Sequence, residues 1–195
     1  MKITVYNKTN QFEGFLDGVL VPAQPHLANI VEIKTWKEDL SQADGIFTSR
    51  KNNFKLGVKT ADCSAITMYD KNFYWVVHAG WRGLVFGIVE KMLEKFENPT
   101  IYVAPFYKKF EIQKDFCYDM IEEKFWKQFF EEENWKILFN FQWALKSVLP
   151  SNAVFDKRDT FFDEDFYSWR RDGTEKRNYT VIINSQLLTK NHLFL

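Results

Sequence analysis

Two short runs of alternating apolar and β-branched residues, Ser64–Tyr69 and Phe73–His78, are separated by only three polar residues. Such runs joined by a short polar segment are typical of a β-hairpin. With a two-residue loop at Asp70-Lys71, the register pairs Cys63 with His78. Directly opposed residues of antiparallel strands have Cα atoms about 4.5–5.5 Å apart. The sequence therefore predicts that a thiol and an imidazole meet at the open end of this hairpin.

A tight turn and then a helix are expected after the hairpin. Ala79–Gly83 carries one indole and one guanidinium between two glycines. Beyond it, apolar residues recur at helical spacing from Val85 to Phe96, with charged residues on the opposite face. The N-terminus of a helix offers unpaired N–H groups to an anion. The alternative interpretation is an ordinary strand-to-helix joint with a buried cysteine and a packed histidine.

Several segments of the chain, taken in order, form one pattern. They are Gln24-Pro25-His26 with Ile30-Val31 behind it, Ala43–Thr48, TADC at Thr60–Cys63, HAGWRG at His78–Gly83, and FYSWRRDG at Phe166–Gly173 with Arg177 shortly after it. This pattern resembles the laccase-domain family, which is often named multicopper polyphenol oxidase and is better described as purine nucleoside phosphorylase. The resemblance covers most of the chain.

The chain also departs from the family pattern. The segment before His26 is shorter than usual, Leu27 replaces the usual glycine, and the cysteine-containing continuation after Pro105 is missing. The backbone beside His26 is therefore expected to differ locally from that of the family.

Predicted strands and helices are mixed along residues 1–195, which we interpret as a single domain. Strands are expected at Lys2–Tyr6, Phe15–Val21, Asn29–Ile33, Asp44–Thr48, Leu56–Thr60, Thr100–Ala104, Ala153–Phe155 and Tyr179–Asn184, and further helices at Asp115–Phe130 and Trp143–Leu149. Phe15–Val21 is expected to pair with Lys2–Tyr6. The pattern fits an α/β or α+β sandwich. The resemblance implies mixed β-sheets packed between helices, in a layered sandwich similar to the fold of Cys/His toxin deamidases.

Composition excludes several classes of protein. A chain of 195 residues, 46% hydrophobic, can bury a core, and its formal net charge of zero leaves no electrostatic footprint for nucleic acid. The sequence has no apolar run of membrane-spanning length, no signal-peptide core at its start, and two cysteines at unrelated positions. We expect a cytoplasmic protein without nucleic-acid or membrane partners, and the oligomeric state stays open.

Three residues of metal-ligand type converge under this interpretation: His26, Cys63 and His78. Catalytic zinc usually has three protein ligands and an open fourth position, whereas structural zinc has four. With the resemblance, zinc is the expected cofactor, and copper is the alternative metal because the same donors bind it tightly. A four-copper laccase uses many imidazoles, and this chain has three histidines in total. Laccase-like phenol oxidation is therefore expected to be secondary.

The resemblance implies phosphorolysis of adenosine, inosine and guanosine, with adenosine deamination as a second activity. The expected partners are a purine nucleoside and phosphate. Zinc lowers the pKa of a water molecule bound to it and so supplies a nucleophile for deamination near neutral pH. Under this reading the catalytic residues are Cys63, Asp62 and Arg82, and the substrate-binding residues are Trp81, Ser168 and Arg170.

Phosphorolysis requires a site for phosphate beneath the ribose C1′. Arg82 and Arg170, with the turn amides near Gly80 and Gly83, are the candidate ligands of this anion. Arg171 is the candidate for a structural ion pair, because adjacent side chains rarely face the same way.

The remaining candidates each have two interpretations. Asp62 could orient a ligand histidine or accept a proton, or it could be a cap or turn residue. Trp81 and Trp169 could stack on a purine or pack in the core. Cys117 is assigned to packing, and His192, close to the C-terminus, is expected to have no role.

Two other classes of function stay open. In one, Cys63 is a nucleophile with His78 as its base, in a metal-free Cys/His amidase, and the resemblance links some relatives to peptidoglycan-precursor editing. In the other, the zinc is purely structural and the protein is a binding module. Metal content measured together with turnover separates the three classes.

Overall fold

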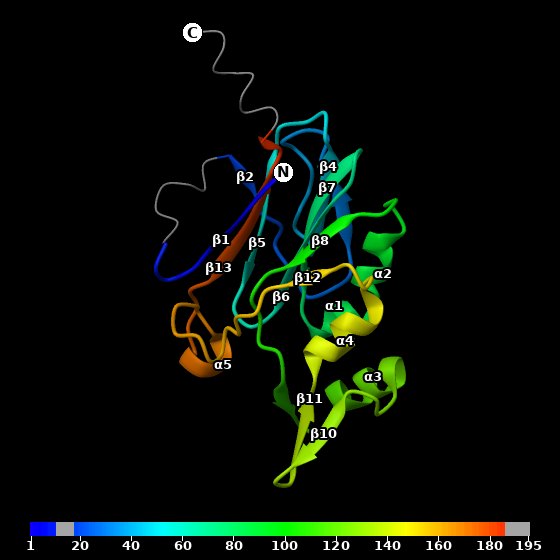
Figure 1. Ribbon diagram of the computed structural model, residues 1–195, viewed down its shortest axis with the longest axis vertical. Helices are drawn as coiled ribbons and strands as arrows, with labels where there is room; N and C mark the ends of the chain where they lie inside the picture. Colours follow the sequence, from blue (N-terminus) through cyan, green and yellow to red (C-terminus); the bar gives the residue numbers. More distant parts are fainter. Residues whose placement is uncertain (11–17, 186–195) are drawn as a thin grey trace.

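A six-stranded mixed sheet contains the predicted hairpin, in a computed structural model that describes residues 1–10 and 18–185 (Figure 1). In spatial order its strands are β12 (Val154–Phe155), β8 (Thr100–Val103), β6 (Ser64–Tyr69), β7 (Phe73–Ala79), β4 (Gly45–Ser49) and β3 (Ile30–Glu32). The outer pairs β12–β8 and β3–β4 are parallel, and the inner pairs are antiparallel. The predicted strands at these places are confirmed within one or two residues.

The hairpin between β6 and β7 is confirmed, but its register differs from the predicted one. The loop is Lys71-Asn72, so that His78 pairs with Ala65 rather than with Cys63. The Asp70 carboxylate shifts the loop by one residue, because it accepts hydrogen bonds from the N–H groups of Asn72 (2.7 Å) and Phe73 (2.8 Å).

A second sheet of four strands packs against the first. Its order is β1 (Lys2–Tyr6), β13 (Asn178–Ile183), β5 (Lys55–Thr60) and β2 (Val19–Leu20). The predicted pairing of Phe15–Val21 with Lys2–Tyr6 is wrong for the described part of that segment, because β2 runs parallel to β5. Its residues 15–17 lie outside the described residues. The partner of β1 is β13, from the far end of the chain.

Side-chain alternation gives the six-stranded sheet one apolar core on each face. Toward the four-stranded sheet, Ala65, Tyr74 and Val76 pack with residues of β5 and β13. Toward the helices, Ile66, Met68, Trp75 and Val77 pack with buried residues of α1 (Trp81–Val85), α2 (Ile88–Leu93) and α4 (Phe141–Val148). The layers are therefore sheet, sheet and helices (Figure 1), and the predicted α+β sandwich of mixed sheets is confirmed.

The helix expected from Val85 to Phe96 is the shorter α2, and most of the turn expected at Ala79–Gly83 is instead part of the short helix α1. Gly87 lies between them with φ 77°, in the left-handed region that glycine adopts at little cost. The break turns α2 so that Ile88, Val89 and Met92 are buried on the sheet.

A third sheet, of three antiparallel strands, was not predicted. It consists of β10 (Phe130–Glu133), β11 (Lys136–Phe139) and β9 (Phe110–Ile112). The helix expected at Asp115–Phe130 is α3 (Phe116–Phe125), because Trp126 has φ 55° and turns the chain toward β10.

The last two helices are fixed by side-chain caps. Asn140 accepts a hydrogen bond from the N–H of Trp143 (3.1 Å), so α4 begins two residues earlier than predicted. Ser168 caps α5 (Trp169–Asp172) in the same way. In the described part of the chain, no helix has the length and apolar character needed to cross a membrane.

Candidate functional site

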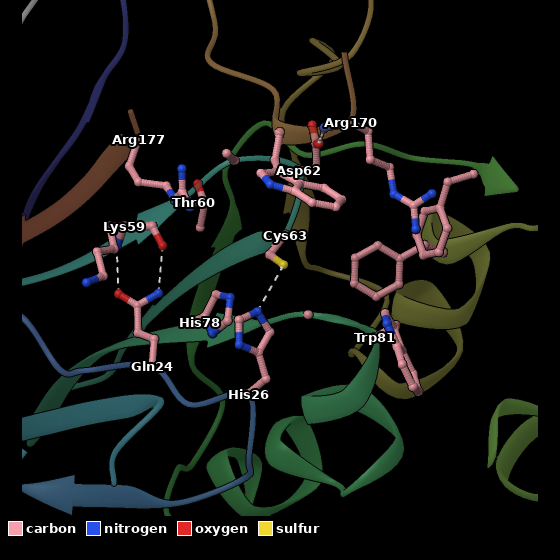
Figure 2. A pocket seen from close by; sticks show the side chains of 15 residues that line it. Gln24, His26, Lys59, Thr60, Asp62, Cys63, His78, Trp81, Arg170 and Arg177 are labelled. Carbon is pink, nitrogen blue, oxygen red and sulfur yellow. Dashed lines mark hydrogen bonds between the residues drawn. The ribbon is translucent and has the colours of Figure 1, made fainter. Parts of the chain in front are cut away.

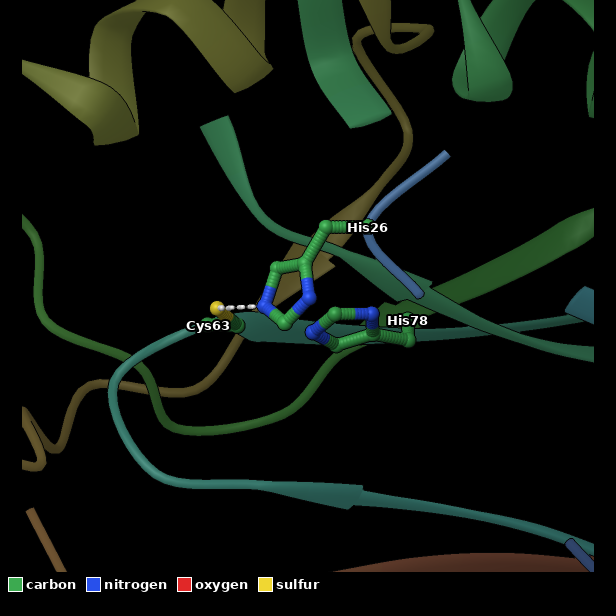
Figure 3. A group of neighbouring side chains, drawn as sticks. All are labelled: His26, Cys63 and His78. Carbon is green, nitrogen blue, oxygen red and sulfur yellow. Dashed lines mark hydrogen bonds between the residues drawn. The ribbon is translucent and has the colours of Figure 1, made fainter. Parts of the chain in front are cut away.

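The structure brings His26, Cys63 and His78 together from three separate segments (Figure 3). Their potential ligand atoms lie within 4.8 Å of one another. The Cys63 Sγ is 4.0 Å from the His26 Nε2, and the two imidazole rings lie edge-on with centroids 4.7 Å apart. His78 is buried, Cys63 is half-buried and His26 is exposed, so the group opens to solvent on one side.

Strand periodicity explains why Cys63 and His78 meet although they are not register partners. Ala65 is opposite His78, and its side chain belongs to the core between the two larger sheets. Cys63 is two residues before Ala65, so its side chain lies on the same face of the sheet. The side chains of Cys63 and His78 therefore lie close together as predicted, although the hairpin loop lies one residue later than expected.

Asp44, which the sequence analysis did not single out, contacts both histidines. Its side chain is 0% exposed and lies directly before β4. The Oδ1 atom is 2.8 Å from the Nδ1 of His78 and accepts a hydrogen bond from the N–H of His26 (3.0 Å). The Oδ2 atom accepts from the N–H of Leu27 (2.7 Å). A lone aspartate before a strand gives no sequence signal for such a position.

Electrostatics in this group couple the thiol to the imidazoles. Burial opposes ionisation of Cys63, but the adjacent His78 and His26 rings outweigh it and lower the pKa of the thiol to about 6. Burial also disfavours the charged form of His78, but the Cys63 thiolate and the hydrogen bond to Asp44 outweigh it and raise its pKa to about 9. Without a metal, both shifts favour transfer of the thiol proton from Cys63 to His78.

Asp62 contacts two loops and does not orient a histidine of the His–Cys–His group. Its side chain is buried, with φ 85° at the backbone. Its Oδ1 accepts a hydrogen bond from the Thr160 hydroxyl (2.9 Å), and its Oδ2 accepts from the N–H of Arg170 (2.8 Å). Both carboxylate oxygens are thus engaged, and the carboxylate that contacts a histidine of the group is that of Asp44.

Two other candidates from the sequence do not line the pocket around these residues. The exposed Arg82 guanidinium lies over the rings of Trp81 (5.3 Å to the centroid) and Phe116 (5.5 Å). The buried Ser168 hydroxyl accepts a hydrogen bond from the N–H of Arg171 (3.2 Å) as the cap of α5. Cys117 lies on α3, half-buried, and is also outside the pocket. His192 is outside the described residues.

A cavity of about 470 Å³ surrounds the His–Cys–His group (Figure 2). Its size lies within the range of small-molecule sites. One part of the lining is aromatic, from Trp81, Phe110, Phe141 and Trp169. Trp81 and Trp169 were candidates from the sequence, whereas the two phenylalanines were missed because they lie far along the chain from the recognised motifs.

Arg170 and Arg177 also line the cavity and lie on opposite sides of it (Figure 2). The Arg170 guanidinium lies 4.4 Å from the centroid of the Phe110 ring and donates to the carbonyl of Glu111. Arg177 donates to two backbone carbonyls, those of Thr174 and Lys176. Among residues 1–10 and 18–185, neither guanidinium has a carboxylate partner.

Arg171, in contrast, is structural, as the sequence predicted. Its guanidinium forms an ion pair with Asp172 (2.7 Å). It also donates to four backbone carbonyls, those of Thr160, Phe161, Asp163 and Phe166. These contacts fix the loop that presents Trp169 and Arg170 to the cavity.

Gln24 anchors the segment that carries His26. Its side-chain amide donates to the carbonyl of Lys59 (2.6 Å) and accepts from the N–H of the same residue (2.9 Å; Figure 2). Gln24 and His26 have φ of 68° and 64°. Backbone in this region is uncommon for residues other than glycine and often occurs at functional sites.

The donor set fits a zinc ion. Two imidazole nitrogens and one thiolate are ligands that zinc accepts, with one position left open. Gly80 leaves the space that such an ion needs, because a Cβ at this residue would lie 3.0 Å from the Cys63 Sγ and 3.4 Å from the His26 Cδ2.

Comparison with known proteins identifies relatives along nearly the whole chain. A family model described as multi-copper polyphenol oxidoreductase laccase matches residues 6–185. A purine nucleoside phosphorylase of Aquifex aeolicus is 28% identical over 196 residues, covering 94% of this chain and 92% of that protein. One of Rickettsia prowazekii is 26% identical, covering 76% of this chain and 59% of that protein. One of Clostridium acetobutylicum is 34% identical, covering 51% and 43%. The chain therefore spans less than two thirds of the last two relatives.

Solved structures share the fold. YlmD from Geobacillus stearothermophilus superimposes with a TM-score of 0.71 at 20% identity, covering 86% of this chain and 74% of that one. A Neisseria meningitidis protein superimposes with a TM-score of 0.72 at 23% identity, covering 85% and 74%.

Proposed function

The chain belongs to the multi-copper polyphenol oxidoreductase laccase family, and on this premise we propose that it is a zinc-dependent purine nucleoside phosphorylase. The observation that carries the proposal is one cavity that combines a His–Cys–His group, four aromatic side chains and two guanidinium groups without carboxylate partners in the described chain. The names of the A. aeolicus and R. prowazekii relatives support the same activity. The proposed substrates are adenosine, inosine and guanosine, with deamination of adenosine as a second activity.

The proposed metal ligands are the Nε2 atoms of His26 and His78 and the Sγ of Cys63. A zinc ion bound there would act as a Lewis acid in the cavity. The His–Cys–His group is open to solvent on one side, because His26 is exposed and Cys63 is half-buried. Substrate could approach a bound metal from that side.

Phosphorolysis needs phosphate oriented toward C1′ of the ribose. A phosphate oxygen forms a bond to C1′ while the C1′–N9 bond breaks, and its electron pair stays with the base, which takes up a proton. Arg170 and Arg177 are the proposed phosphate ligands, because guanidinium groups bind phosphate in a bidentate manner. Arg170 was also a candidate from the sequence, and Arg177 takes the place of Arg82, since Arg82 lies outside the cavity over Trp81 and Phe116.

The purine base is proposed to stack on the aromatic part of the cavity. Trp81 and Trp169 come from α1 and α5, at two different parts of the lining. Trp169 is 59% exposed, so its indole ring is accessible to a ligand in the cavity. Stacking accepts any purine, which fits a broad choice of nucleoside.

Copper oxidase chemistry is a poor fit despite the family name. The chain has three histidines in total, and two of them belong to the His–Cys–His group. Copper bound by the same three residues is proposed to give phenol oxidation only as a secondary activity.

One observation favours a second candidate function. In the metal-free state, Cys63 and His78 have the lowered and raised pKa values of a nucleophile and its partner. A Cys/His amidase would use this pair directly. It would require no zinc and no phosphate, so its turnover differs from phosphorolysis in both requirements.

Steady-state kinetics with inosine and varied phosphate test the proposal. Zinc-loaded protein should release hypoxanthine only with phosphate, and Arg170→Ala or Arg177→Ala should raise the KM for phosphate at least tenfold. Arg82→Ala is the comparison. An equal or larger rise of the KM for phosphate in Arg82→Ala would show that Arg82 is a phosphate ligand. Release of hypoxanthine without phosphate would contradict phosphorolysis.

A further inference from the structure

We infer that Asp44 is a positioning residue that fixes both histidine ligands, selecting the ligating nitrogen of His78 and the backbone conformation of His26. The inference rests on the proposed metal site. It concerns how that site is built, so it can be tested through metal binding and proton positions rather than through turnover.

Asp44 is immobilised by its own backbone. Its N–H donates to the carbonyl of Asn29 (2.9 Å), and its carbonyl accepts from the N–H of His78 (2.7 Å). The side chain is 0% exposed and accepts all its hydrogen bonds from residues of the proposed site or directly beside it. The carboxylate therefore has a fixed place relative to both β7 and the His26 segment.

The contact with His78 decides which ring nitrogen can bind a metal. A carboxylate accepts hydrogen bonds, so the Nδ1 atom that lies 2.8 Å from Oδ1 must carry a proton. The Nε2 atom then becomes the ligand. A metal-binding histidine commonly has such a partner on its other nitrogen, which fixes both tautomer and ring orientation.

The contact with His26 acts through the backbone. His26 has φ 64°, and this conformation directs two consecutive N–H groups, its own and that of Leu27, toward Asp44. These hydrogen bonds offset the cost of a left-handed residue that is not glycine. The conformation places the His26 ring beside Cys63, at 4.0 Å from Nε2 to Sγ.

Asparagine cannot reproduce this arrangement in either orientation of its amide. With its NH₂ group at the Oδ2 position, it would face the N–H of Leu27. With its NH₂ group at the Oδ1 position, it would face the N–H of His26 and the Nδ1 of His78. Each orientation sets donor against donor, and the second also forces the proton of neutral His78 onto Nε2.

The first test is zinc affinity, measured by competition with a chromophoric chelator. Asp44→Asn should lower the affinity about 10–100-fold, as for other partners of metal-binding histidines. Asp156→Asn is the matched control, because the Asp156 carboxylate also accepts several hydrogen bonds, from Tyr102 and Arg158, without contacting a histidine. The control should stay within about twofold of the wild type. Wild-type affinity in folded Asp44→Asn would overturn the inference.

The second test uses only the wild-type chain and so does not depend on folding of the variant. In ¹⁵N-labelled protein, the imidazole spectrum should show a proton on the Nδ1 of His78 with zinc bound and also without metal. An unprotonated Nδ1, or zinc bound through Nδ1, would overturn the inference. Failure to detect phosphorolysis would leave both readouts unaffected and would count only against the proposed function.

Discussion

The Sγ of Cys63 lies 4.0 Å from the Nε2 of His26, although 37 positions separate the two residues along the chain. The contact joins the end of the β6–β7 hairpin to the segment after Pro25, which Gln24 fastens to β5 through two hydrogen bonds. Neither segment could form the site alone, because His78 from the hairpin and His26 from the loop contribute different donors.

Removing this thiol should remove the metal. Cys63→Ala leaves two imidazoles, and two ligands do not normally retain zinc in a protein site. Zinc content measured by atomic spectroscopy after dialysis should fall from about one per chain to near zero. Cys117→Ala is the control, because Cys117 lies outside the cavity on α3. Full zinc occupancy in Cys63→Ala would contradict the ligand assignment.

The two thiols should titrate in different pH ranges when no metal is bound. The pKa of Cys63 is lowered to about 6, so its thiolate is present above this pH and is lost as the pH falls through it. Burial and then Asp115 raise the pKa of Cys117 above its usual value of 9.0. The rate of alkylation by iodoacetamide should therefore have its midpoint near pH 6 at Cys63 and above 9 at Cys117.

Peptide mass spectrometry resolves the two sites in one sample. At pH 7, labelling of metal-free protein should occur first at Cys63. Equal rates at the two cysteines, or a midpoint for Cys63 near 9, would show that His78 and His26 do not stabilise the thiolate.

A methyl group at residue 80 should interfere with metal binding more than with folding. Gly80 has φ −80° and ψ 175°, which alanine adopts freely, but its Cβ would lie 3.0 Å from the Cys63 Sγ. Gly80→Ala should therefore bind zinc at least tenfold more weakly.

Gly173→Ala gives the opposite result and serves as the control. Its φ of 59° strains an alanine by about 1 kcal/mol, but its Cβ has nothing within 4 Å. This variant should lose stability in urea and keep its zinc affinity. Unchanged zinc affinity in Gly80→Ala would show that the ligands are further apart when metal binds.

Replacing Asp62 should lower the free energy of unfolding, because its carboxylate connects two loops. Its buried carboxylate joins the Thr160 hydroxyl to the N–H of Arg170. Asp62→Ala leaves both donors unpaired and should lower the free energy of unfolding by about 2–4 kcal/mol, measured in urea. Thr160→Val removes one partner and should cost about 1–3 kcal/mol. Loss of turnover in Asp62→Ala with unchanged stability would instead support a role in proton transfer.

Most strands of the two larger sheets, and the hairpin, could be predicted because local periodicity determines them. Two-residue alternation identifies β6 and β7, and it also places Cys63 and His78 on one face even with the loop misassigned by one residue. The place of β13 between β1 and β5 could not be predicted, because this pairing joins segments from opposite ends of the chain. The third sheet was missed since β10 is FEEE, a charged segment without a strand pattern.

In the site, too, local features could be predicted from the sequence and contacts between distant segments could not. The three proposed ligands could be recognised by residue type, but the role of Asp44 depends on contacts with a distant loop and with β7. Arg82 was assigned to the site as a candidate phosphate ligand in the HAGWRG segment, which also contains Trp81. Both belong to α1, where consecutive side chains point about 100° apart, so only Trp81 lines the cavity.

Turnover of inosine by metal-free and zinc-restored protein, in saturating phosphate, is the most direct test of the account. Chelated protein should release no hypoxanthine, and one equivalent of zinc should restore release together with stoichiometric ribose 1-phosphate. Restoration should fail when Cys63 is alkylated before zinc is added, and Cys117→Ala should behave as the wild type. Phosphate-dependent release that continues at full rate in zinc-free protein would contradict the proposal that His26, Cys63 and His78 act as metal ligands in this reaction.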